Sequence, residues 1–237
     1  MRYLGGKNQL GKEISGILKK YAPPEKYSKY IEPFCGSLGV TIHMVDDYKV
    51  YVSDYQKDLI LLWKAIKSGT FKYPRSVSKQ TYYRYKNDPK PSAMRAFVGF
   101  GCSFGGKWFG GYAEDYNKKN YTICSETVRS IKRLESSIKK IKSIKHCSYD
   151  KWHLKNCLIY CEPPYRNTTG YDGIDSFDHE KFWDTIRKWS KRNIVIVSEY
   201  TAPKDFKCIW KKQRAQSLAP NNNKTKTEKL FMLPKRK

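Results

Sequence analysis

A short acidic turn after an apolar segment carries the clearest sign of chemistry in this sequence. Residues 157–161 form the apolar segment, and the turn that follows reads Glu162, Pro163, Pro164 and Tyr165. Adjacent prolines fix a rigid, extended turn, and ligands of parallel sheets gather at the carboxyl ends of strands. The turn therefore directs a carboxylate, a backbone carbonyl and an aromatic ring into one crevice, a set that suits a planar amine. The competing interpretation is an ordinary proline turn with a surface acid.

A second candidate site lies in residues 32–39, which read E-P-F-C-G-S-L-G. Glycines between a strand and a helix let a ligand approach the backbone, although two glycines alone are weak evidence. Asp54 ends the next predicted strand, 18 residues after Gly36. An acid at about this distance binds ribose hydroxyls in nucleotide-binding folds. Because the sequence contains no GxxxxGK[ST] motif, a nucleoside triphosphate is disfavoured as the ligand.

The chain is strongly basic, which points to a polyanionic partner. Its 237 residues hold 47 lysines and arginines against 22 acids, a formal net charge of +25. Such an excess favours DNA, RNA or an anionic membrane surface as partner. Nucleic acid is favoured among these because phosphate neutralisation dominates its binding. The competing interpretation is a basic protein from a genome whose codons favour lysine.

The charge is concentrated in the middle of the chain. Residues 67–150 contain 18 lysines and arginines against 6 acids, together with eight tyrosines. Within them, residues 128–144 have a helical apolar period and predict a basic amphipathic helix, which either binds nucleic acid or is a solvated face. Candidate DNA-binding side chains in this segment are Arg84, Lys86, Arg95 and Lys107.

Apolar patterns on either side of this segment predict strands that alternate with helices. This alternation favours an α/β fold with a parallel, Rossmann-like sheet. Residues 1–66 and 151–237 are expected to form the sheet domain, and residues 67–150 a smaller, basic, mainly helical insert. The expected helices lie at 10–18 (with Asn8 as N-cap), 40–46, 59–66 and 182–189. The expected strands lie at 29–34, 49–53, 157–161, 193–198 and 230–233, and a loop is expected at 221–224.

Neither a metal site nor a membrane segment is expected. The seven cysteines form no CxxC pair, and the four histidines show no ligand spacing. We therefore expect reduced thiols, a cytoplasmic location and no metal. No stretch approaches the ~18 apolar residues that a membrane span needs, and the first residues lack the apolar core of a signal peptide.

Taken together, the motifs resemble those of the Dam-like adenine-N6 DNA methyltransferases of the alpha order. The resemblance covers nearly the whole chain, and the order of its motifs is more specific than any one of them. Residues 2–7 resemble the family's K-W-x-G-G-K, residues 32–39 resemble its E-P-F-x-G-x-G, and residues 52–54 resemble its ribose-binding strand end. Residues 146–149 resemble a short motif that precedes the catalytic strand. Residues 162–165 stand where the family has D-P-P-Y, and residues 226–231 resemble its closing strand.

The resemblance implies an S-adenosylmethionine-dependent enzyme, without a metal, that methylates the exocyclic amine of a flipped adenine in double-stranded DNA. It implies a Rossmann-like methyltransferase sheet with a target-recognition insert, a restriction-modification, phage or viral setting, and a monomer or weak dimer. The implied catalytic residues are Glu162, Pro163 and Tyr165. The implied cofactor-binding residues are Tyr3, Lys7, Phe34, Gly36, Asp54, Ser148, Tyr149 and Glu162.

Two positions depart from the family pattern and leave alternatives open. Most members have tryptophan where Tyr3 stands and aspartate where Glu162 stands. The longer acid moves the carboxylate by roughly an ångström, and such a displacement can cost ~100-fold in rate. One alternative is therefore a DNA-binding protein that holds the cofactor but has weak chemistry. Another is methylation of the cytosine amine or of RNA.

Overall fold

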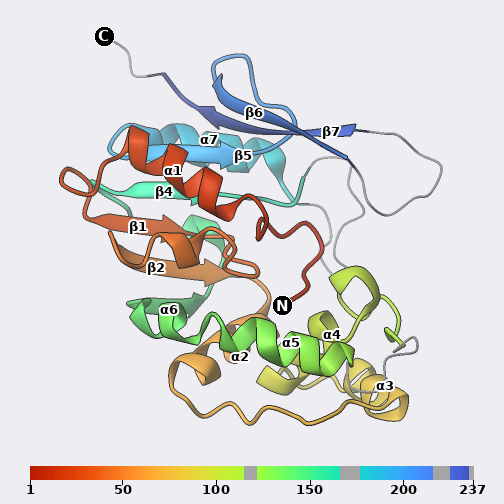
Figure 1. Ribbon diagram of the computed structural model, residues 1–237. Coiled ribbons are helices and arrows are strands. Elements are labelled where there is room, and N and C mark those ends of the chain that lie inside the picture. The colour runs from red at the N-terminus through yellow and green to blue at the C-terminus, as the bar shows by residue number, and fades with distance from the viewer. Residues whose placement is uncertain (115–121, 166–176, 216–224, 235–237) are drawn as a thin grey trace.

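The computed structural model describes residues 1–114, 122–165, 177–215 and 225–234, which fold around one mixed sheet (Figure 1). Within these residues the sheet has seven strands in the order β3-β2-β1-β4-β5-β7-β6. The strands are β1 (Lys29–Glu32), β2 (Lys49–Asp54), β3 (Ser143–His146), β4 (Leu158–Cys161), β5 (Ile194–Ser198), β6 (Lys207–Ala215) and β7 (Thr225–Met232).

The strand order defines where a ligand can bind. Strands β1 to β5 pair in parallel, whereas β7 runs antiparallel to both β5 and β6. From β1 the chain proceeds outward to β2 and β3, and it then returns to β4 on the other side of β1. The switch in direction between β1 and β4 opens a crevice beyond their carboxyl ends. The α/β class and the Rossmann-like sheet expected from the sequence are confirmed.

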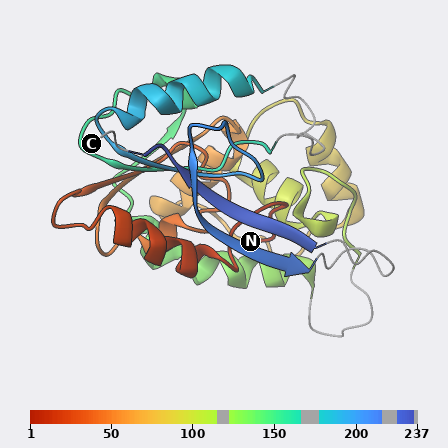
Figure 2. The same cartoon turned by 90° about the horizontal axis from the view of Figure 1, so that it is seen from above.

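Helices cover both faces of the sheet, as the view from above shows (Figure 2). Helix α7 packs on one face, where Phe182 and Ile186 meet Ile159 and Val195. Helix α1 lies on the opposite face, which belongs to the larger apolar core. The helices are α1 (Gly11–Tyr21), α2 (Lys57–Lys67), α3 (Lys79–Asn87), α4 (Ala93–Gly101), α5 (Ile123–Lys132), α6 (Glu135–Lys140) and α7 (His179–Ser190).

The basic middle segment forms a helical layer of α3, α4 and α5 beside the sheet (Figure 1). Its apolar residues, such as Phe97 and Ile131, belong to the same core as Leu18 and Val50 of the sheet domain. Strand β3 also comes from this segment, yet it pairs with β2 as the edge of the sheet. The sheet therefore resumes by Ser143, earlier than the expected boundary at residue 151.

Three local expectations were wrong. The single helix expected over 128–144 is divided into α5, α6 and β3, because the N–H of Lys142 bonds to the Val50 carbonyl and starts the pairing with β2. The segment 40–46 forms only a short 3₁₀ turn, Thr41–His43. Helix α1 begins after Leu10 rather than after Asn8. The loop expected at 221–224 lies outside the described residues.

Three expectations from the sequence concern thiols, membrane helices and metal ligands. All seven cysteines are free thiols. Among the residues described, no helix is long and apolar enough to cross a membrane, and no group of three or more histidine, cysteine or acidic side chains could hold a metal ion.

A partly buried ion pair joins the helical layer to α2. The guanidinium of Arg95 lies 2.9 Å from Asp58 Oδ2, and its Nε donates to the Tyr85 carbonyl. Asp58 is buried and also accepts from the Ser92 backbone N–H at 2.7 Å. Arg95, expected to bind DNA, is thus engaged inside the protein.

Arg95→Ala should destabilise the fold, because it leaves the buried Asp58 carboxylate without its cation. We expect the free energy of unfolding, measured by urea denaturation, to fall by about 3 kcal/mol, the lower end for breaking a buried pair. The matched control is Arg84→Ala on the exposed side of α3, which should change it by less than ~0.5 kcal/mol. Equal losses in the two variants would show that the pair does not anchor the helical layer.

Candidate active site

A cavity of about 940 Å³ lies at the carboxyl ends of β1, β2 and β4, where the strand order switches. A smaller hollow of about 480 Å³ lies against α7 and contains none of the residues predicted from the motifs. The larger cavity collects all ten residues implied as catalytic or cofactor-binding. These are Tyr3, Lys7, Phe34, Gly36, Asp54, Ser148, Tyr149, Glu162, Pro163 and Tyr165.

Asp54 joins the loops that follow β1 and β2. Its Oδ2 accepts the Gly36 N–H at 2.9 Å, and its Oδ1 accepts the Gln56 N–H at 2.9 Å. Burial raises the pKa of Asp54, although these N–H donors act against the shift. Gly36 has a φ of +42°, and a Cβ there would lie 3.2 Å from the Tyr3 ring. The loop thus needs glycine to hold its amide on the carboxylate.

Aromatic rings form another wall of the cavity. The ring of Phe34 stacks on Tyr149 at 5.3 Å between centroids, and Phe177 packs edge-on against Phe34 at 6.0 Å. A flat apolar wall and a carboxylate at the end of β2 are a donor set that fits the adenosine part of S-adenosylmethionine. The cavity residues therefore suit this cofactor on their own chemistry.

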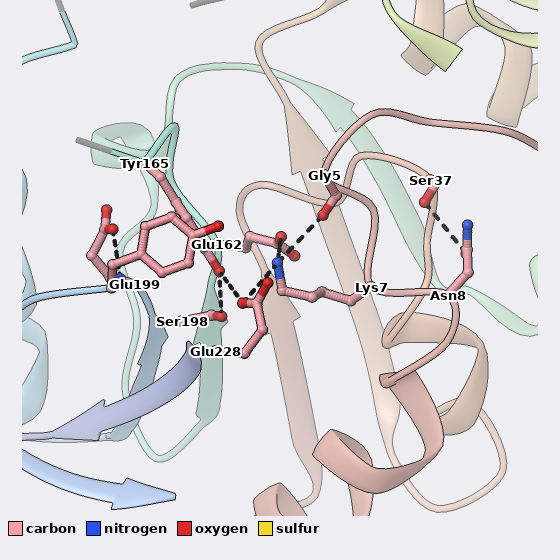
Figure 3. A network of polar contacts seen from close by, with 10 residues as sticks. Gly5, Lys7, Asn8, Ser37, Glu162, Tyr165, Ser198, Glu199 and Glu228 are labelled. Atoms are coloured by element: carbon pink, nitrogen blue, oxygen red, sulfur yellow. Dashed lines mark hydrogen bonds and ion pairs between the residues drawn. The ribbon is translucent and has the colours of Figure 1, made fainter. Parts of the chain in front are cut away.

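Lys7 lies at the centre of a buried charge cluster (Figure 3). Its side chain is 3% exposed, and its ammonium donates to Glu162 Oε1 and to the Gly5 carbonyl. Glu228 Oε2 lies 3.5 Å from the same nitrogen. Burial alone would lower the pKa of Lys7, but the two carboxylates outweigh burial and raise it. Lys7 therefore stays charged.

Glu162 is the carboxylate that the ion pair places in the cavity. Burial raises the pKa of Glu162, and Lys7 opposes that shift. Lys7 bonds to Oε1, and among the described residues no hydrogen bond to Oε2 is found. The side chain is 20% exposed, so Oε2 can receive a donor from the cavity.

Tyr165 is fixed at its hydroxyl. The hydroxyl shares a hydrogen bond with Ser198 Oγ at 2.7 Å and donates to Glu228 Oε2 at 3.1 Å. Its ring packs edge-on against Tyr200 at 4.5 Å, and the Lys7 nitrogen lies 4.8 Å from its centroid. A ring held in this way offers a defined face to a planar ligand.

The four basic residues expected to bind DNA have different surroundings. Arg84 and Lys86 are exposed on α3, Lys107 lines the cavity, and Arg95 is paired with Asp58 as described above. The structure therefore brings only Lys107 next to the candidate chemistry.

Sequence reasoning missed two acids and one exposed aromatic side chain. Glu228 lines the cavity although no motif assigned it a role. Glu32 was read only as part of a loop motif, yet it is a buried carboxyl group. Phe104 is 69% exposed and lies on the 3₁₀ turn Phe104–Gly106. The Gly106 carbonyl of this turn accepts a hydrogen bond from the Leu4 N–H at 3.0 Å.

The comparisons with known proteins agree with the motifs. Residues 3–96 match the family model described as D12 class N6 adenine-specific DNA methyltransferase. The chain is 24% identical over 250 residues to the type II methyltransferase M.MjaIII of Methanocaldococcus jannaschii, covering 87% of this chain and 85% of that protein. These two matches support the predicted family and, with it, the predicted enzyme class, an S-adenosylmethionine-dependent adenine-N6 DNA methyltransferase.

Solved structures of other methyltransferases share a general likeness. The rRNA methyltransferase AviRa of Streptomyces viridochromogenes is 11% identical with a TM-score of 0.46, over 94% of this chain and 83% of that one. Magnesium protoporphyrin IX methyltransferase of Synechocystis PCC 6803, with bound SAM, is 9% identical with a TM-score of 0.42, and the match covers 96% of this chain and 79% of that one. At these TM-scores the likeness adds nothing to the sheet topology above.

Asp54→Ala should weaken cofactor binding, because it removes the carboxylate at the end of β2 and releases the Gly36 amide. We expect the dissociation constant for S-adenosylmethionine, measured by calorimetry, to rise at least tenfold. The control is Asp46→Ala, which removes an exposed acid paired with Lys140 and should leave binding unchanged. If both variants bind the cofactor as the wild type does, Asp54 has no role in the cofactor site.

Glu32 gives the fold a characteristic dependence on pH. Burial raises the pKa of Glu32 to about 8, against hydrogen bonds donated by Thr41 and Tyr30. The raised value means that its stabilising contribution is complete below the ordinary pKa near 4.5 and is lost as the pH rises through about 8.

Glu32→Gln should remove this dependence, since an amide carbonyl accepts the same two hydrogen bonds without ionising. Between pH 5 and 8 the wild type should lose free energy of unfolding relative to the variant, by at most ~1.4 kcal/mol per pH unit. Urea denaturation across this range measures the difference. Parallel profiles for the two proteins would show that Glu32 does not titrate in the folded state.

Proposed function

We propose that this chain methylates the exocyclic amine of adenine at a particular sequence in duplex DNA, acting on a base flipped into the cavity. The observation that carries the proposal is that Glu162, Pro163 and Tyr165 line the same cavity as the aromatic wall of Phe34 and Tyr149. Because M.MjaIII is named a type II methyltransferase, we extend the proposal to a role in restriction-modification.

The arrangement suits an amine whose lone pair is delocalised into an aromatic ring. Glu162 and the Pro163 carbonyl would accept the two amine hydrogens and favour tetrahedral geometry at nitrogen. S-adenosylmethionine supplies, when bound, a methyl group on a positively charged sulfonium. As positive charge develops on nitrogen, the carboxylate stabilises it in place, and the face of Tyr165 adds a cation–π attraction.

Base flipping follows from the depth of the site. The target nitrogen of a stacked, paired adenine would not reach a cavity-lining carboxylate that is only 20% exposed. Exposed Phe104 stands on a turn that continues into cavity-lining Lys107. We propose that Phe104 enters the space left by the flipped base, as apolar wedges do in other DNA complexes.

The helical layer that adjoins this turn is our candidate for target recognition. It runs from residue 67 to about residue 142, before β3 rejoins the sheet. Exposed Arg84 and Lys86 on α3 would contact phosphates there. Its position beside the cavity mouth would let one bound duplex reach both the basic surface and the active site.

Variants of Glu162 test the catalytic proposal. Glu162→Gln should lower methyl incorporation at least 100-fold, because an amide nitrogen then donates where the target amine also donates. Glu162→Asp should slow the reaction about tenfold, since the site is set for the longer acid that Lys7 holds. The measurement is single-turnover transfer of labelled methyl groups to adenine-containing duplexes. Glu13→Gln, which removes a surface acid paired with Lys212 outside the helical layer, is the control.

Other outcomes of this experiment separate the alternatives. A Glu162→Gln enzyme as fast as the wild type would exclude the catalytic role. A Glu162→Asp enzyme at least tenfold faster would support the cofactor-bound, weakly active protein instead. Equal methylation of cytosine-only duplexes or of RNA would replace adenine DNA as the proposed substrate.

A further inference from the structure

Glu228 is a buried acid that the proposed reaction has not used. It lies on β7 with 8% exposure and contacts two components of the site. Its Oε2 accepts from the Tyr165 hydroxyl at 3.1 Å and lies 3.5 Å from the Lys7 nitrogen. Figure 3 shows it beside the Lys7 nitrogen, next to Ser198 and Tyr165.

The cluster contains two carboxylates for one ammonium. Lys7 bonds to Glu162 and has Glu228 within ion-pair distance, so two carboxyl groups face one ammonium. A buried ammonium that loses its only carboxylate is strongly disfavoured. With Glu228 in reach, the Lys7 nitrogen can change partner by a small movement, and it need not become unpaired.

The carboxylate of Glu228 affects how well Glu162 can accept a hydrogen in the proposed reaction. Glu162 would accept a hydrogen from the target amine at Oε2 while its Oε1 is held by Lys7. A strong ion pair draws negative charge toward the ammonium and makes the carboxylate a poorer acceptor. The closer Lys7 moves to Glu228, the more of that charge Glu162 can present to the amine.

We propose that Glu228 is a positioning residue for methyl transfer: it takes up the ammonium of Lys7 as Glu162 engages the target amine, and it holds the Tyr165 ring through the phenol. The inference rests on the proposed function and extends it to β7. A structural role alone would need only a hydrogen-bond acceptor for Tyr165, whose hydroxyl also bonds to Ser198. The negative charge beside Lys7 is what an uncharged acceptor cannot supply.

Glu228→Gln separates charge from geometry, because the amide oxygen can still accept from Tyr165 while the charge is lost. We expect the single-turnover rate on adenine duplexes to fall at least tenfold, with the dissociation constant for S-adenosylmethionine within about twofold. Glu228→Asp keeps the charge and should retain the rate within about threefold. The control is Glu13→Gln, which removes the acid paired with Lys212 on β6 and should leave the rate unchanged.

The pH profile supplies a readout that packing would not move. Ionised groups and phenols facing Glu228 are Lys7 from the N-terminal segment, Glu162 and Tyr165 from the turn after β4, and Tyr200 after β5. The negative charge of Glu228 helps to raise the pKa of Glu162. In Glu228→Gln the acidic limb of the rate profile should therefore move to lower pH.

The results distinguish this inference from the proposed function. A wild type that methylates no adenine duplex would overturn the proposed function itself. An active wild type with a Glu228→Gln variant of equal rate and unchanged acidic limb would overturn only the role of Glu228. If Glu228→Asp loses as much rate as Glu228→Gln, packing rather than charge is responsible, and the inference is likewise wrong.

Discussion

The buried ammonium of Lys7 is the constraint on which the site depends. An ion with 3% exposure must be paired, and the pairs that Lys7 makes join three separate parts of the chain. Lys7 belongs to the N-terminal segment, Glu162 follows β4, and Glu228 lies on β7. The ion pairs thus hold together the N-terminal segment, the turn after β4 and strand β7, which lies between β5 and β6.

The sheet topology explains how a residue of β7 can reach the same point. The strands β1 and β4 are parallel, so the loops that follow them lie at the same end of the sheet. Because β7 is antiparallel to β5, with Ser198 opposite Leu230, the first residues of β7 lie at that same end of the sheet. Glu228, two residues before Leu230, therefore faces the cavity. An additional parallel strand in this position would have brought its final residues there instead.

Much of the fold could be predicted from the sequence because apolar runs with short turns are local signals. Strands β1, β2, β4 and β5 were predicted, as were site residues at the carboxyl ends of β1, β2 and β4, and the structure gathers those residues around one cavity. The errors depend on tertiary contacts. The segment 128–144 was interpreted as one helix because its apolar period carries no information about the pairing of its last residues with β2. Arg95 was interpreted as a DNA-binding residue because its partner Asp58 is 37 residues away in sequence. Basic strand β6 and the role of Glu228 had no local pattern to reveal them.

The glutamate at position 162 becomes understandable within this cluster. A longer side chain has more rotamer freedom, and ordering it has an entropic cost that aspartate largely avoids. In this chain the Lys7 ammonium restrains the carboxylate at Oε1, while the rigid Pro163–Pro164 turn fixes the backbone behind it. Lys7 provides that restraint before a target amine is engaged, and Glu228 lies 3.5 Å from the same ammonium. The departure at one position is thus coupled to two side chains far away in sequence, and the three are best regarded as one unit.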